Sequence, residues 1–128
     1  MTNVQDQMTN EPPMSKIKPV FDLQERTAQL GEWILEFATT VPKTIITIPL
    51  IGQIVRSGTS VGANYMEADA AFTKRDFQHK LSIARKEAKE TMHWLRMIAK
   101  AVPALIEEAR KIAQECRELV KIFSKILG

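Results

Sequence analysis

An unbroken amphipathic pattern runs through residues 73–102, TKRDFQHKLSIARKEAKETMHWLRMIAKAV. Thr73 and Asp76 stand three positions apart at its head, the spacing at which side-chain oxygens satisfy the free backbone amides of a helix start. Apolar side chains then recur at steps of three and four residues with no proline or glycine among them, which predicts one long helix. This stripe consists of Phe77, Leu81, Ala84, Ala88, Thr91, Leu95, Ile98 and Val102.

The preceding sequence predicts two more amphipathic helices. Asp22 and Glu25 repeat the cap spacing, and the apolar stripe that follows them runs to Val41 before Pro42 ends it. We interpret residues 42–49, a β-branched run between two prolines with no partner strand, as a connector or an irregular helix start. The second helix begins at about Leu50, and its stripe contains Ile51, Ile54, Val55, Gly58, Gly62, Tyr65, Asp69 and Phe72.

A fourth helix is expected after Pro103, because proline is suited to the first turn of a helix. Its stripe contains Leu105, Ala109, Ile112, Cys116, Leu119, Val120, Phe123 and Leu127. Four helices of similar length joined by short connections bury their stripes together as an antiparallel up-down bundle. We therefore expect an all-α fold, with one four-helix bundle domain over residues 21–128 and a flexible tail over residues 1–20.

Length and composition place the chain among ordinary globular proteins. It has 128 residues, 45% of them hydrophobic, and its 18 basic and 15 acidic residues give a formal net charge of +3. The single cysteine, Cys116, excludes an intrachain disulfide and fits a reducing compartment. No apolar run approaches the roughly 20 residues of a membrane helix, and the polar start lacks the segments of a signal peptide. We expect a cytoplasmic protein that does not contact membranes.

The sequence carries none of the common catalytic motifs. It has no glycine-rich phosphate loop followed by Lys-Ser/Thr, no His-Glu-x-x-His, no Cys-x-x-Cys and no serine elbow. Cys116 lies on the apolar stripe of the fourth helix, which favours a buried structural thiol over a nucleophile. His79 and His93 are 14 positions apart, about 21 Å along a helix, too far to share a metal ion. We expect no enzyme, no cofactor and no metal site.

The third predicted helix carries a local excess of positive charge. Between Lys74 and Lys100 there are eight basic residues and three acidic ones. At about 100° per residue, all of the basic residues except Lys80 fall within an arc of roughly 120° beside the apolar stripe. A row of cations on a rigid helix displaces counterions from a polyanion, whereas the alternative is an ordinary solvated face. We call this set the basic ribbon: Lys74, Arg75, Arg85, Lys86, Lys89, Arg96 and Lys100.

Two further patterns indicate contact surfaces. The third helix carries Ile83, Trp94, Met97 and Ile98 as a second apolar seam on the side away from its main stripe. Such a seam favours self-association, the alternative being that Trp94 covers the edge of a groove. The second helix carries a polar stripe opposite its apolar one, made of Gln53, Arg56, Ser60, Asn64 and Glu67. This stripe is interpreted as a solvated or hydrogen-bonded structural face, or as a contact with a ligand, RNA or another subunit.

Several segments together resemble one bacterial family. They are 21–27 (FDLQERT), 53–68 (QIVRSGTSVGANYMEA), 76–77 (DF), 86–91 (KEAKET) and 93–95 (HWL). Their sequence is similar to that of the 23S ribosomal RNA intervening-sequence proteins, with Arg56, Ser60, Asn64 and Glu67 at the family's motif positions. The resemblance covers Phe21 to about Ile98. It implies a four-helix bundle that assembles as a ring, a pentamer, and that is associated with RNA or ribosomes. Similar accessory proteins of diversity-generating retroelements, which are more basic, bind nucleic acid and act with a reverse transcriptase.

From these observations we expect a non-enzymatic homo-oligomer that binds structured RNA or DNA through the phosphate backbone, using the basic ribbon. One alternative is a scaffold that recruits a protein partner, such as an RNA-processing or reverse-transcribing enzyme, and has no nucleic-acid affinity of its own. Another is a helix-turn-helix regulator that turns about Gly58 or Gly62, which requires a break in the second helix.

Overall fold

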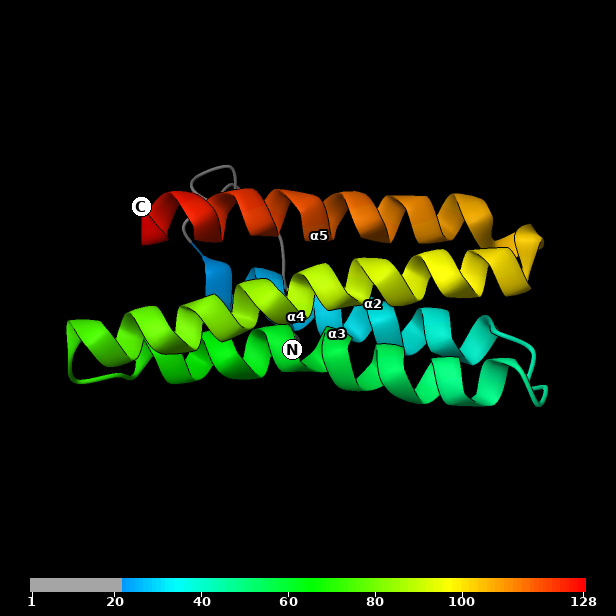
Figure 1. Cartoon of the computed structure of the whole chain (residues 1–128), viewed down its shortest axis with the longest axis horizontal. Helices are drawn as coiled ribbons and strands as arrows, with labels where there is room; N and C mark the ends of the chain where they lie inside the picture. The colour runs from blue at the N-terminus through cyan, green and yellow to red at the C-terminus, as the bar shows by residue number, and fades with distance from the viewer. Residues whose placement is uncertain (1–21) are drawn as a thin grey trace, which may run out of the picture.

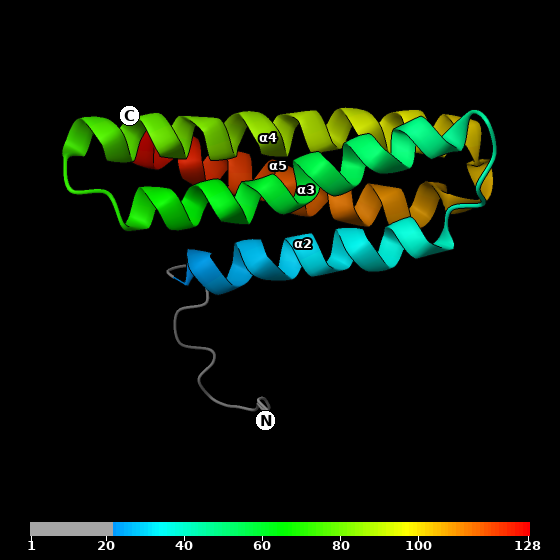
Figure 2. The same ribbon diagram turned by 90° about the horizontal axis from the view of Figure 1, so that it is seen from below.

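The computed structural model describes residues 22–128, so the predicted tail at residues 1–20 lies outside the described part of the chain. The helices, with their bounds, are α2 (Leu23–Thr40), α3 (Thr47–Asp69), α4 (Lys74–Ala101), the 3-10 turn η3 (Pro103–Leu105) and α5 (Ile106–Leu127). Successive helices run antiparallel, and α4 lies between α3 and α5 (Figures 1 and 2). The predicted all-α up-down bundle is therefore confirmed, and none of the described residues forms a strand.

The predicted helix starts are correct at α2 and α4. The carboxylate of Asp22 accepts a hydrogen bond from the backbone amide of Glu25 at 3.1 Å. The hydroxyl of Thr73 accepts one from the amide of Asp76 at 3.0 Å. Because each of these caps is a local interaction between residues three apart, the sequence spacing was sufficient to locate both helix starts.

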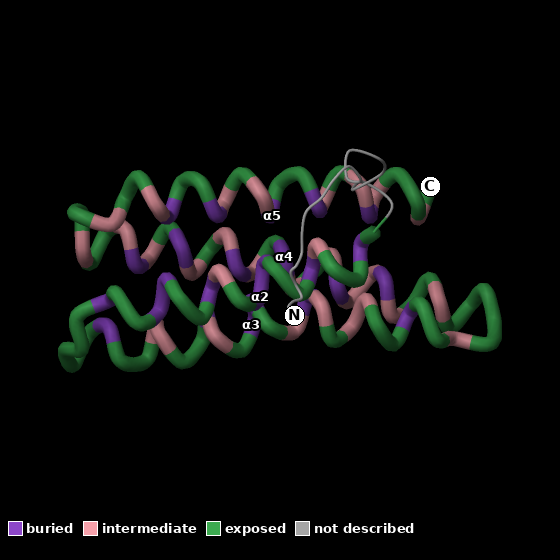
Figure 3. The backbone as a smooth tube through the Cα atoms, turned by 180° about the vertical axis from the view of Figure 1, so that it is seen from behind, coloured by how far each residue is buried: buried purple, intermediate pink, exposed green. Residues whose placement is uncertain are grey.

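Buried residues recur along all four helices, where the backbone is coloured purple in Figure 3. The predicted stripes of α4 and α5 account for much of this core. Fully buried members are Leu81, Ala84, Ala88, Thr91, Leu95, Ile98, Ile112, Cys116, Leu119 and Phe123. The ends of the two stripes, including Phe77, Val102 and Leu105, are half-buried.

The start of α3 differs from the prediction, because the helix begins at Thr47 and not at about Leu50. The hydroxyl of Thr44 accepts hydrogen bonds from the amides of Ile46 and Thr47 at 3.2 and 3.1 Å. This pair of bonds satisfies free amides at the helix start. Pro49 lies within the first turn, where its missing amide hydrogen leaves no helical bond unmade.

The prediction of the apolar stripe of α3 was wrong at its C-terminal end. The helix ends at Asp69, and both Asp69 and Phe72 are exposed. The buried face instead includes Ser57, Val61 and Ala68. Ser57 is tolerated in the core because the hydroxyl of Thr91 on α4 donates a hydrogen bond to it at 2.9 Å.

Glycines in α3 allow α2 to approach closely. A Cβ added at Gly58 would lie 2.7 Å from Cγ1 of Ile34, and one added at Gly62 would lie 3.3 Å from the backbone of Thr27. The α3 helix is nevertheless continuous through both glycines. The helix-turn-helix alternative, which needs a break there, is therefore wrong.

Candidate nucleic-acid interface

The two glutamates of α4, Glu87 and Glu90, are directed toward α3. The guanidinium of Arg56 on α3 forms salt bridges with Glu87, at 3.2 Å, and with Glu90. The indole Nε1 of Trp94 also donates a hydrogen bond to Glu90 at 2.9 Å. The hydrogen bond from Trp94, together with Arg56, holds the pKa of Glu90 below its usual range. Both glutamates are therefore engaged at the α3–α4 edge.

Three glutamates of α5, Glu108, Glu115 and Glu118, are directed toward α2 in the same way. The guanidinium of Arg26 on α2 contacts Glu115 at 2.7 Å and Glu118 at 2.9 Å. Trp33, also on α2, donates a hydrogen bond from its indole nitrogen to the carboxylate of Glu108 at 2.7 Å. These contacts join α5 to α2 and not to α4.

The basic ribbon therefore lies on a face of α4 from which carboxylates are turned away. Six of its residues are exposed, and Arg85 is half-buried and donates to the hydroxyl of Ser124 on α5 at 3.1 Å. Within residues 22–128, no ribbon residue forms a salt bridge with a carboxylate. Lys80, which the periodicity placed off the ribbon, instead pairs with Glu67 on α3 at 2.7 Å. From Lys74 to Lys100 the ribbon extends about 39 Å, at 1.5 Å per residue.

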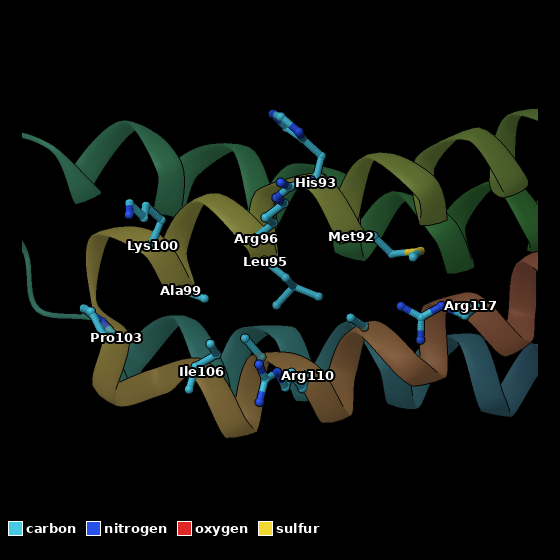
Figure 4. Close-up of a pocket in the computed structure, with 12 residues that line it drawn as sticks. Met92, His93, Leu95, Arg96, Ala99, Lys100, Pro103, Ile106, Arg110 and Arg117 are labelled. Carbon is cyan, nitrogen blue, oxygen red and sulfur yellow. The ribbon is translucent and has the colours of Figure 1, made fainter.

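A groove between α4 and α5 continues this cationic face, and Figure 4 shows its lining. Arg96 and Lys100 lie along its α4 side, and Arg110 and Arg117 along its α5 side. The two arginines of α5 were not among the residues predicted from the sequence. Their spacing of seven positions, two helical turns, was a signal that they share one face of α5.

The predicted apolar seam of α4 is only partly available to a partner. Ile98 is 0% exposed within the single chain, so its assignment to an oligomer interface is wrong. Trp94 packs against the bundle core and donates to Glu90, as described above. Ile83 and Met97 remain half-buried on α4. A seam at an interface would be formed by Ile83, Met97 and the outer edge of Trp94.

The predicted polar stripe of α3 forms bonds within the bundle. Arg56 binds the two glutamates of α4, and Glu67 accepts a hydrogen bond from Lys80 at 2.7 Å. The hydroxyl of Ser60 donates to the backbone carbonyl of Arg56 at 2.6 Å, and the amide nitrogen of Asn64 donates to the carbonyl of Ser60 at 2.9 Å. Arg56 and Glu67 therefore tie α3 to α4, whereas Ser60 and Asn64 bond to carbonyls within α3.

The structure offers no obvious catalytic or metal centre in the part that it describes. Cys116 is fully buried, and burial raises the pKa of its thiol to about 12, so the reactive thiolate is suppressed at neutral pH. Among residues 22–128, no group of three or more His, Cys, Asp or Glu side chains is placed to hold a metal ion. None of the described helices is both long enough and apolar enough to cross a membrane.

Comparisons with known proteins agree with this architecture. A search of curated proteins finds no match. The chain is similar to a protein of unknown function from the S23 ribosomal protein family of Bacteroides thetaiotaomicron, whose crystal structure shares 29% identity and a TM-score of 0.73. The match covers 82% of this chain and 97% of that one. The family model of the 23S rRNA-intervening sequence proteins matches residues 21–125. The chain therefore belongs to the 23S rRNA-intervening sequence protein family.

Proposed function

We propose that this protein is a non-enzymatic, homo-oligomeric bundle that binds structured RNA or DNA through the phosphate backbone, with the basic ribbon of α4 as its contact surface. The observation that carries the proposal is the separation of charge on α4. Its glutamates pair with Arg56 at one edge, and the ribbon cations at the other edge form no salt bridge with the described carboxylates. Unpaired cations are the groups that replace counterions around phosphates.

The dimensions of the ribbon suit a nucleic-acid duplex. Its length of about 39 Å is close to one turn of a B-form duplex, about 34 Å. A straight, rigid row of cations follows a backbone and does not read base edges, because base-specific contacts need side chains inserted into a groove. We therefore expect binding with little sequence preference and a steep dependence on salt.

The family assignment supports RNA as the preferred ligand. The name of the family refers to an intervening sequence of 23S rRNA, and the similar crystal structure is described as an S23 ribosomal protein family member. Neither description gives a function, so this support concerns the class of ligand and not a defined role. The reference to ribosomal RNA in the family description supports a cytoplasmic location, where that RNA is found.

Self-association would set several ribbons side by side and raise the affinity for a long polyanion through multivalency. The half-buried Ile83 and Met97 on α4 are the apolar residues that we assign to this contact. Multi-angle light scattering at micromolar concentration should give a mass that is a multiple of the 14.5 kDa chain mass. A monomer mass would contradict the oligomeric part of the proposal.

Charge reversal at the centre of the ribbon tests the nucleic-acid part. The triple variant Lys86→Glu, Lys89→Glu and Arg96→Glu should weaken binding to a labelled RNA hairpin by at least 100-fold at about 100 mM salt, because each lost phosphate contact also leaves a repulsive charge. All three side chains are exposed, so the melting temperature should change little.

A matched control reverses three cations outside the ribbon and the α4–α5 groove: Lys43, Lys111 and Lys125, all exposed. Both triple variants have the same net charge, so a non-specific charge effect would weaken binding equally in both. Equal loss in the two variants, or retained affinity in the ribbon variant, would contradict the assignment of the ribbon as the binding surface.

A further inference from the structure

The groove between α4 and α5 has an apolar floor that phosphate binding does not use. It encloses about 790 Å³ and lies between the C-terminal half of α4 and the N-terminal half of α5 (Figure 4). Its apolar lining consists of Met92, Leu95, Ala99, Pro103, Ile106, Ala109 and Ala113. Three of these are alanines, whose small side chains keep the floor low enough for another backbone to approach.

The rim of the same groove is cationic on both sides. Arg96 and Lys100 border it on α4, Arg110 and Arg117 border it on α5, and no carboxylate is among its lining residues. Arg110 also contacts Glu107 at 3.2 Å, but these side chains are 68% and 78% exposed. Such an exposed pair is weak and exchanges readily for another carboxylate.

We infer that this groove binds an amphipathic helix of a partner protein, one whose apolar stripe is flanked on both sides by glutamate or aspartate. Two adjacent antiparallel helices form a trough in which a third helix can pack, with its apolar residues against the floor. Arg96 and Lys100 are four residues apart, and Arg110 and Arg117 seven apart, so each rim repeats at one or two helical turns. Carboxylates at the same spacings on a docked helix would form salt bridges with these cations.

The composition of the floor favours a protein helix over nucleic acid. A single-stranded nucleic acid needs aromatic rings on which its bases stack, and the floor has none. The only aromatic ring in the lining is that of His93, which Figure 4 shows pointing away from the floor. A phosphate backbone would use the cations and leave the apolar floor exposed. An acidic amphipathic helix matches both parts of the groove.

The first test measures binding of three synthetic peptides to the full chain by fluorescence anisotropy. The probe is an 18-residue helix-forming peptide with leucine at positions i, i+3, i+4 and i+7 and glutamate on both flanks. One control peptide replaces the glutamates by lysine, and the other replaces the leucines by serine. The probe should bind at least 10-fold more tightly than either control. Equal binding of the three peptides would overturn the inference.

Two variants then separate this groove from the basic ribbon. Ala113→Leu fills the floor without changing charge, and Arg110→Glu with Arg117→Glu reverses exposed rim charges at little risk to the fold. Each should weaken peptide binding at least 10-fold, while Ala113→Leu leaves RNA binding within 2-fold of wild type. Conversely, Lys86→Glu with Lys89→Glu should weaken RNA binding and leave peptide affinity within 3-fold.

The remaining outcomes identify a different occupant and overturn the inference. Equal loss of RNA and peptide binding in Ala113→Leu would assign the groove to nucleic acid. A fall in oligomer mass in the same variant, measured by light scattering, would assign it to a second copy of this chain. Because peptide and RNA are measured separately, a failure of peptide binding leaves the test of the basic ribbon intact.

Discussion

Replacing Gly58 by alanine is expected to lower the free energy of unfolding by up to about 2 kcal/mol, although alanine is the better helix former. The added Cβ would lie 2.7 Å from Cγ1, 2.9 Å from Cγ2 and 3.1 Å from Cβ of Ile34, which is fully buried. The Cβ of Ile34 is fixed to its backbone, so rotation of the side chain cannot relieve all three contacts and α2 must move. Overpacking of this kind costs about 1–3 kcal/mol, against a gain of about 1 kcal/mol in helix propensity.

Gly52 provides the matched control on the same helix. A Cβ added there meets no atom within 4 Å. Gly52→Ala should therefore stabilise the protein by about 0.5–1 kcal/mol through helix propensity alone. The two alanine substitutions should differ in sign, and the difference between them should be about 2 kcal/mol.

Urea unfolding followed by circular dichroism, at one fixed protein concentration, measures both free energies. In a background of Ile34→Ala the contacts at 2.7 and 2.9 Å are removed and only the 3.1 Å contact with Cβ remains, so Gly58→Ala should be much less destabilising there, a coupling that a double-mutant cycle detects. If Gly58→Ala were as stable as Gly52→Ala in the wild-type background, the close packing of α2 on α3 would be refuted.

Three further predictions concern buried and partly buried polar groups. Thr91→Val should lower the free energy of unfolding, measured in urea, by about 1–3 kcal/mol because it leaves the buried hydroxyl of Ser57 without its donor. Adding Ser57→Ala should recover part of that loss. Strict additivity of the two substitutions would contradict the interaction. Cys116, with its pKa raised to about 12 by burial, should resist alkylation at pH 8 in the folded protein and react rapidly in urea; rapid reaction without urea would contradict its burial. The lowered pKa of Glu90 means that its carboxylate stabilises the fold above its ordinary pKa and that this contribution is lost as the pH falls through the lowered pKa. Glu90→Gln should therefore show a smaller loss of stability between pH 6 and pH 3 than wild type, measured by thermal unfolding, and an unchanged loss would count against the interaction.

Local interactions explain why much of the fold was predictable from the sequence. The caps at Asp22 and Thr73 depend on residues three positions away, and the stripes of α4 and α5 depend on helical periodicity alone. The stripe of α3 was less predictable because burial of Ser57 depends on a hydroxyl from α4. Phe72 lies beyond the end of α3, and neither proline nor a stop glycine marks that end in the sequence.

Only part of the candidate site was predictable from the sequence. The ribbon lies on one helix, so its arc followed from the turn angle per residue. Arg110 and Arg117 were missed because α5 mixes acidic and basic residues along the sequence. The cationic character of the groove appears only when Glu115 and Glu118 are seen to pair with Arg26 on α2. That separation of charge is a tertiary property.

The central claim is that the basic ribbon binds the nucleic-acid backbone, and a salt titration tests it most directly. Purified protein, free of nucleic acid, is titrated against a labelled RNA hairpin and a DNA duplex of matched sequence between about 50 and 300 mM salt. Up to seven ribbon cations are available, so a plot of log affinity against log salt concentration should have a slope of about −4 to −6 for the duplex, at about −0.9 per phosphate contact. The Lys86→Glu, Lys89→Glu, Arg96→Glu variant should flatten that slope. Absence of binding at the lowest salt concentration would contradict the claim and leave the ribbon as a solvated face.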